Sequence, residues 1–372
     1  GGAIIVAAIF EFAGAFLAGG HVTDTVRKGM LDMSLLGREQ LIYGMMASLA
    51  SAGTLLIGAT RFGLPISTTH AIVGAIVGFG AVAIGIDAVN WPKVLQISLS
   101  WITSPLLAGV IAFAIFHLIR STILNKSNPV HQIRKYGPAF FFFVFFIIGL
   151  VTLFKGLKHI NLDLDLMEAL AGSVALGLIG SGIGAFFIRR VQIGEADPDH
   201  RFDQVERIFV VLQILTACAI AFAHGSNDVA NAIGPLAAIV NAVENVDLTA
   251  KAPVAPWMLA IGGLGIVIGL ATWGYRVMET VGKKITELTP SRGFAAQLAA
   301  ASTIVLASRL GIPISTTHTL VGAVLGVGLA RGITALDLRV VGNILASWIA
   351  TLPIAAALSV FFYYFFKGLL TA

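Results

Sequence analysis

Arg61 to Gly80 reads RFGLPISTTHAIVGAIVGFG, and Arg309 to Gly328 reads RLGIPISTTHTLVGAVLGVG. Thirteen of the twenty positions are identical, and six of the seven differences exchange one apolar residue for another. Both copies share the centre P-I-S-T-T-H, at Pro65 to His70 and at Pro313 to His318. In each copy an apolar segment leads to a break at glycine and proline, and a second apolar segment follows. This pattern is typical of a helical hairpin broken inside a membrane, present once in each half of a duplicated protein.

The repeated centre has the features of a site for a small anion. A proline at the first helical position loses no hydrogen bond, because that amide has no helical partner in any case. The Ser-Thr-Thr run adds hydroxyl donors to the free N–H groups of the first turn, and the helix dipole adds positive potential. The hydroxyls belong to Ser67, Thr68, Thr69, Ser315, Thr316 and Thr317.

At membrane depth, donors without a partner cost several kcal/mol each, and a small oxyanion can satisfy them. The alternative is that the hydroxyls bond back to the carbonyls of their own helices, as intramembrane Ser and Thr often do. Two copies at equivalent places favour the anion over this alternative.

Composition places the chain in a membrane. Of its 372 residues, 57% are hydrophobic and 12% charged, and 41 are glycine, which suits close helix packing in lipid. The single cysteine, Cys218, excludes a disulfide scaffold and a thiolate metal site. Basic residues fall between apolar segments, so we interpret them as topology signals and expect no nucleic-acid partner. We expect a multi-pass protein of a plasma or inner membrane, surrounded by its lipid bilayer.

The apolar segments predict an all-α membrane protein, and the two re-entrant, broken helical hairpins predict an inverted-repeat transporter. We divide it into a first membrane half (1–188), a charged connection (189–207) and a second half (208–372). The predicted spans are 1–20, 94–119, 140–154, 166–188, 208–240, 257–275 and 338–366, with hairpin arms at 41–60, 66–86, 294–308 and 314–330. Segment 208–240 is too long for one unbroken span, aromatic 140–154 should face lipid, and the glycines of 166–188 should serve packing.

Two further expectations concern the halves as a whole. If the basic segment from Arg120 to Lys135 is cytoplasmic, the two hairpins enter from opposite sides of the membrane, as an inverted repeat requires. The similarity of Thr23–Gly29 to Met278–Lys284 then puts the first-half partner of Asn227 and Asp228 before residue 1. We therefore expect a further helix ahead of the sequence, and call the first half N-terminally incomplete.

A second polar motif, A-H-G-S-N-D-V-A-N-A, lies near the middle of segment 208–240. Asn227 and Asn231 are spaced i,i+4, and Asp228 and Asn231 are spaced i,i+3, so the three side chains can face one point. Amide oxygens and a carboxylate suit sodium or a proton, and Gly225 permits a local opening of the helix. The alternative is a polar clamp between helices.

Glu11 is the one charge of the first apolar segment, where a carboxylate is costly, and we predict that it faces the protein interior. The alternative is a carboxylate paired with a basic residue of a neighbouring helix. His70, His224 and His318 form no H-x-x-x-H or H-E-x-x-H pair, so we expect orienting hydrogen bonds from them rather than metal binding.

Together, G-S-N-D-V-A-N-A and the doubled P-I-S-T-T-H resemble the signature motifs of the inorganic phosphate transporter (PiT) family, as does F-E-F-A-G-A followed by T-V-R-K-G. The resemblance covers essentially the whole chain. It implies two inverted repeats that carry phosphate with a coupling cation, sodium or proton, and no cofactor. It also implies that the six hairpin hydroxyls contact phosphate, that Asn227, Asp228 and Asn231 serve the cation and the substrate, and that Glu11 is linked to transport.

The chain departs from that family at two places. The first N-D-x-x-N copy is absent, and G-F-A-A-Q-L carries Gln297 where the family commonly has glutamate. We keep Gln297 among the coupling residues, although an amide cannot carry a proton as a carboxylate can.

Several alternatives to phosphate symport stay open. Another tetrahedral oxyanion, chiefly sulfate, would use the same donors, and a receptor of the same fold would bind anion without flux. A membrane hydrolase would need a nucleophile elbow or a metal pair, and the sequence has neither, so we expect a protein that is not an enzyme. A homodimer also remains open.

Overall fold

The computed structural model describes residues 2–20, 29–32, 35–153, 164–190, 201–244, 254–310, 312 and 314–370. Within these ranges the chain is helical, and its one extended contact is an isolated bridge between Leu31 and Val89. Seven of the described helical stretches are long and apolar enough to cross a membrane: 38–61, 91–124, 129–151, 166–190, 203–244, 256–284 and 338–370. The predicted all-α membrane fold is therefore confirmed, whereas the inverted relation of its repeats stays a prediction.

Both predicted hairpins are present. The first pairs α3 (Arg38–Arg61) with α4 (Thr68–Phe79), and the second pairs α11 (Pro290–Arg309) with α12 (Thr316–Arg331). At the first break Gly63 has φ +69°, a conformation that glycine adopts at little cost. Pro313, in the second break, lies outside the described residues.

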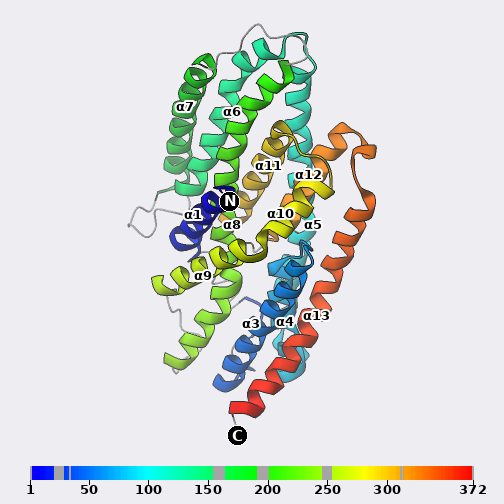
Figure 1. Cartoon of the computed structure of the whole chain (residues 1–372). Helices are drawn as coiled ribbons and strands as arrows, with labels where there is room; N and C mark the ends of the chain where they lie inside the picture. The colour runs from blue at the N-terminus through cyan, green and yellow to red at the C-terminus, as the bar shows by residue number, and fades with distance from the viewer. Residues whose placement is uncertain are drawn as a thin grey trace.

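The two hairpins exchange partners between the halves. Helix α4 packs along α13 (Leu338–Leu370), whereas α12 packs along α5 (Trp91–Ile119) (Figure 1). Glycines make both contacts close: a Cβ on Gly78 would lie 2.5 Å from Ala356 Cα, and a Cβ on Gly326 would lie 2.1 Å from the Gly109 carbonyl oxygen. Small residues thus bring each hairpin against a span of the other half.

Helix α8 (Arg201–Glu244) runs through the middle of the bundle and touches α1 (Gly2–Ala18), α3, α6 (Pro129–Val151), α9 (Pro256–Gly269) and α11. It is one continuous helix of 44 residues, so the predicted interruption of segment 208–240 and the opening at Gly225 are wrong. Gly225 instead lets α1 approach: a Cβ there would lie 2.1 Å from the Glu11 carbonyl oxygen.

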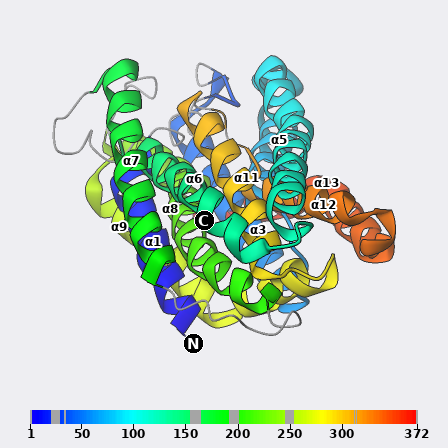
Figure 2. The ribbon, with the colours of Figure 1, turned by 90° about the horizontal axis from the view of Figure 1, so that it is seen from above.

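Helix α6 packs along α7 (Leu166–Arg190) at one edge of the bundle, on the opposite side from α13 (Figures 1 and 2). The glycines of α7 lie against phenylalanines of α6, and a Cβ on Gly184 would lie 2.4 Å from the Phe141 ring. The predicted packing role of these glycines is confirmed.

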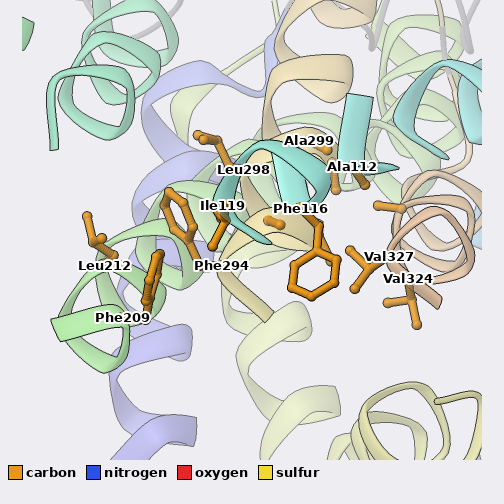
Figure 3. Packing of buried hydrophobic residues seen from close by; sticks show 14 of the residues in the cluster. Ala112, Phe116, Ile119, Phe209, Leu212, Phe294, Leu298, Ala299, Val324 and Val327 are labelled. Carbon is orange, nitrogen blue, oxygen red and sulfur yellow. The ribbon is translucent and has the colours of Figure 1, made fainter. Parts of the chain in front are cut away.

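The expectation that segment 140–154 only faces lipid is wrong for one side of α6. Phe140 is 6% exposed, and its ring lies 6.0 Å from that of Phe209 and 5.8 Å from that of Phe294. Figure 3 shows Phe209 and Phe294 side by side within this core, which joins α6, α8 and α11. The side chains of segment 140–154 are nearly all apolar, but they point to different sides of the helix, because an α-helix has 3.6 residues per turn. Phe143, on another side, is 51% exposed.

Helix bounds also differ from the predicted connections. Arg134 and Lys135, predicted to lie in a connection, lie inside α6. The connection itself is short and follows a π-helical turn, Arg120–Leu124, at the end of α5. The predicted connection 189–207 overlaps the end of α7 and the start of α8, and its residues 191–200 lie outside the described chain, as do most of Thr23–Gly29. After α9 the chain continues through a π-helical turn (Leu270–Gly274), α10 (Tyr275–Glu279) and a second π-helical turn (Thr280–Lys284).

The α1–α8 contact gives a test of the packing. Gly225→Val would push a side chain into the α1 backbone, so we expect it to lower the free energy of unfolding by about 1–3 kcal/mol. Thermal denaturation of the purified protein in detergent measures this loss. The matched control is Gly265→Val on α9, where an added Cβ meets nothing within 4 Å. Equal midpoints for the two variants would contradict the close contact.

Candidate functional site

The tips of both hairpins meet the middle of α8 at one carboxylate. Thr68, the first residue of α4, donates a hydrogen bond to Asp228 Oδ2 at 2.8 Å. Thr316, the first residue of α12, donates to both carboxylate oxygens of Asp228, each at 3.1 Å. Asp228 is only 8% exposed, so these bonds supply part of what water would otherwise give it. The predicted approach of the two tips to one point is therefore what the structure has.

Asn231, one turn further along α8, extends this cluster. Its amide nitrogen donates to the hydroxyl oxygens of Thr68, at 3.2 Å, and Thr69, at 3.3 Å. The Thr68 hydroxyl thus accepts from Asn231 while it donates to Asp228. Asn227, which precedes Asp228, is 1% exposed.

The six hairpin hydroxyls fall into three pairs with different partners. Ser67 and Ser315 cap their helices and accept from the amides of His70 and His318, each at 3.1 Å. The second threonines join the tips to each other: Thr69 donates to the Ile314 carbonyl at 3.1 Å, and Thr317 donates to the Ile66 carbonyl at 3.5 Å. Of the six hydroxyls, those of Thr68 and Thr316 donate to Asp228 in the part of the chain that the structure describes, so the six have different surroundings.

Glu11 reaches the same cluster through His224. The imidazole Nδ1 lies 2.7 Å and 2.9 Å from the two Glu11 carboxylate oxygens, and Nε2 lies 3.3 Å from Asp228 Oδ2. Glu11 is 8% exposed, so its predicted interior position is confirmed. His224 links the two carboxylates, a role that we did not predict. The H-x-x-x-D spacing, which puts His224 and Asp228 on one face of the helix, was the available signal.

Gln297 does not belong to this cluster. Its side-chain oxygen accepts from Thr216 at 2.8 Å, in the contact between α8 and α11. Thr216 precedes Asp228 by more than three turns of α8, about 18 Å along the axis at 1.5 Å per residue. The structure thus separates Gln297 from the other predicted coupling residues.

The cluster suits a hard cation better than a transition metal. Among the described residues there is no group of three or more His, Cys, Asp and Glu side chains that could hold a metal ion. Asn227, Asp228 and Asn231 offer oxygen ligands, which sodium accepts. Their assignment to sodium stays a prediction, as does the assignment of the hairpin hydroxyls to phosphate.

Membrane-spanning helices around a buried polar cluster between two broken hairpins define the class: a multi-pass membrane protein with the architecture of a transporter. Comparison with known proteins specifies it further. The pattern of the phosphate transporter family matches residues 1–359. The chain belongs to this phosphate transporter family, and its predicted placement as a multi-pass integral membrane protein is confirmed.

The relatives agree along nearly the whole chain. A Haemophilus influenzae protein named "Putative phosphate permease" is 47% identical over 365 residues, covering 97% of this chain and 87% of that protein. A Pyrococcus abyssi relative with the same description is 45% identical over 358 residues, covering 96% and 87%. A solved structure described as "The sodium-dependent phosphate transporter" matches with a TM-score of 0.89 at 39% identity, covering 98% of this chain and 89% of that one. The family is one of transporters, which removes the membrane-hydrolase alternative.

The Glu11–His224 pair can be tested by its effect on stability. His224→Leu leaves the buried Glu11 carboxylate without its partner, so we expect a loss on the order of 3 kcal/mol in the free energy of unfolding. Adding Glu11→Gln to that variant should recover part of the loss, because the stranded charge is gone. Denaturation midpoints in detergent measure both, with His117→Leu, at an exposed ring on α5, as control. A double variant no more stable than His224→Leu would contradict the pairing.

Proposed function

We propose that this protein carries inorganic phosphate across the membrane in symport with a cation, and that the cation is sodium. The observation that carries the proposal is the convergence of Thr68 and Thr316, one from each hairpin, on the carboxylate of Asp228. Family membership supports phosphate, and the sodium-dependent neighbour supports sodium.

Phosphate would bind where the two helix N-termini meet. The threonine hydroxyls at the tips already donate to an anionic group, because the Asp228 carboxylate accepts from them in the described structure. A phosphate oxygen makes the same kind of hydrogen bond, and the first-turn amides and helix dipoles add to its attraction. Donation from a protonated phosphate oxygen to Asp228 would favour phosphate over fully deprotonated sulfate.

The same carboxylate explains why a cation is needed. Phosphate at the tips would put a second negative charge beside Asp228, and two unit charges about 4 Å apart repel by roughly 4 kcal/mol at an effective dielectric constant of 20. A sodium ion held by Asp228 with the amide oxygens of Asn227 and Asn231 would cancel this repulsion. Substrate and cation would therefore bind together, which is the physical basis of coupling.

A proton is the second candidate for the coupling ion, and one observation favours it. Glu11, His224 and Asp228 form a continuous acid–imidazole–acid chain that ends at the proposed phosphate site. Such chains can move a proton between groups inside a membrane protein. A protonated His224 would also place a positive charge next to Asp228 without sodium.

A homodimer, left open by the sequence, stays a prediction.

Uptake into proteoliposomes tests the proposal directly. We expect accumulation of labelled phosphate under an imposed sodium gradient, weak competition by sulfate, and little accumulation under a proton gradient alone. Asp228→Asn should abolish sodium-dependent uptake while the protein stays folded, because the amide has no charge to pair with the cation. Uptake driven by the proton gradient would assign the coupling to the proton. Sodium dependence unchanged in Asp228→Asn would contradict the site.

A second test addresses the shared use of both hairpins. Thr68→Val and Thr316→Val should each weaken phosphate binding by roughly ten- to a hundredfold, since each removes one donor worth about 1–3 kcal/mol. The double variant should lose more than either single one. Thr54→Val is the matched control, because Thr54 is on α3 and donates only to its own helix, at Ala50. A double variant that binds phosphate as tightly as the wild type would refute the shared site.

A further inference from the structure

Two histidines lie directly behind the hairpin tips and reach across to the other half. His70 is on α4, two residues after Thr68, and its Nδ1 lies 3.3 Å from the Trp348 carbonyl of α13. His318 is on α12, two residues after Thr316, and its Nδ1 lies 3.4 Å from the Trp101 carbonyl of α5. They are 4% and 2% exposed. The two contacts occupy equivalent places in the two halves.

The chemistry of these contacts fixes the state of both rings. A carbonyl oxygen can only accept, so Nδ1 must carry the hydrogen in each ring. The Trp101 carbonyl needs a donor, because Pro105, four residues further along α5, has no N–H to give it. Nε2 of each histidine is buried and has no hydrogen-bond partner among the described residues. Among the described residues, each ring is thus hydrogen-bonded through Nδ1 alone.

Aromatic neighbours complete the arrangement. His70 lies against Trp101, with ring centroids 3.8 Å apart, and His318 stacks on Trp348 at 3.5 Å. The two imidazoles meet edge to face, with centroids 4.3 Å apart. The first tip has one more bond, from the Trp348 indole N–H to the Pro65 carbonyl at 2.9 Å. Four rings from two hairpins and two spans therefore pack as one group.

Position along the helix connects this group to the site. Residues two apart on a helix point about 200° away from each other, so an anchor at one sets the direction of the other. His70 holds the back of the first turn of α4 while Thr68 points forward to Asp228, and His318 stands in the same relation to Thr316. Turning either first turn about its axis would break the histidine bond and swing the threonine hydroxyl off the carboxylate.

We propose that His70 and His318 are positioning residues that aim Thr68 and Thr316 into the phosphate site, each through the single hydrogen bond that its Nδ1 donates to a tryptophan carbonyl of the other half. This inference rests on the proposed phosphate transport. The histidines touch neither substrate nor cation in this proposal, and they act only through the threonines.

Two amide substitutions separate this role from packing. Asparagine places its side-chain N–H close to where histidine has Nδ1, whereas glutamine places it close to Nε2. Both remove the ring, and asparagine, the smaller of the two, leaves the larger cavity, so a packing defect alone would make His70→Asn the worse variant. We expect His70→Asn to keep a KM for phosphate close to wild type, and His70→Gln to raise the KM roughly tenfold with little change in maximal rate. The same pair at His318 repeats the test if the His70 variants do not fold. Equal KM values for the two amides would overturn the proposal.

A double-mutant cycle tests whether the effect passes through the threonine. In a Thr68→Val background, His70→Gln should raise the KM no further, because there is no hydroxyl left to aim. If the double variant raised the KM by the product of the two single effects, His70 would act independently of Thr68, and the proposal would be overturned.

A measurement without phosphate distinguishes failure of this inference from failure of the proposed function. With Cys218 replaced by alanine, Thr68→Cys and Asp228→Cys can be joined by a short thiol-reactive cross-linker. We expect fast cross-linking with His70 or His70→Asn and clearly slower cross-linking with His70→Gln. Absence of phosphate uptake by the wild type would contradict the proposed function. The cross-linking rate would still show whether His70 orients the side chain at position 68 toward position 228. A rate unaffected by His70→Gln would overturn the positioning role.

Discussion

A single buried carboxylate, Asp228, accepts hydrogen bonds from the first threonine of both broken hairpins, and the surrounding helices are placed so that it can do so. The helix N-termini at the two breaks need an acceptor inside the protein, and the carboxylate needs donors. α8 must therefore run between the tips, and its glycine at position 225 lets α1 come close. That approach brings Glu11 to His224, which connects it to Asp228. The hairpin hydroxyls and the Asp228 carboxylate thus stabilise each other. An anionic substrate could take the place of the carboxylate as the acceptor of these hydrogen bonds.

The sequence predicted the parts of this arrangement that depend on local pattern. The duplicated P-I-S-T-T-H stretch located both hairpins, because a break between apolar segments is visible without knowing any tertiary contact. Helical spacing placed Asp228 and Asn231 on one face, and the cost of a carboxylate in an apolar segment put Glu11 inside. The apolar spans followed from their length, although their ends moved where basic residues such as Arg134 and Lys135 proved to be helical.

Features set by contacts between distant segments were not predictable in the same way. The pairing of Glu11 with His224 joins α1 to α8, and the separate uses of Thr68 and Thr69 depend on where the other hairpin ends. Gly225 illustrates the ambiguity, since a glycine permits both an opened helix and a close neighbour, and only the position of α1 shows which applies. Phe140 was misjudged for a related reason, because an aromatic run does not reveal which side meets another helix.

The exchange of partners between the halves has a consequence for how the protein is made. Helix α4 packs on α13, which follows it by more than 250 residues along the chain, and α5 packs on α12. Ribosomes deliver the chain from its N-terminus, so the first hairpin enters the membrane long before the surface that covers its glycines exists. The two halves therefore cannot mature one after the other. Final assembly has to wait until α13 has been made, and halves made as separate polypeptides would have to find each other in the bilayer before either could complete its fold.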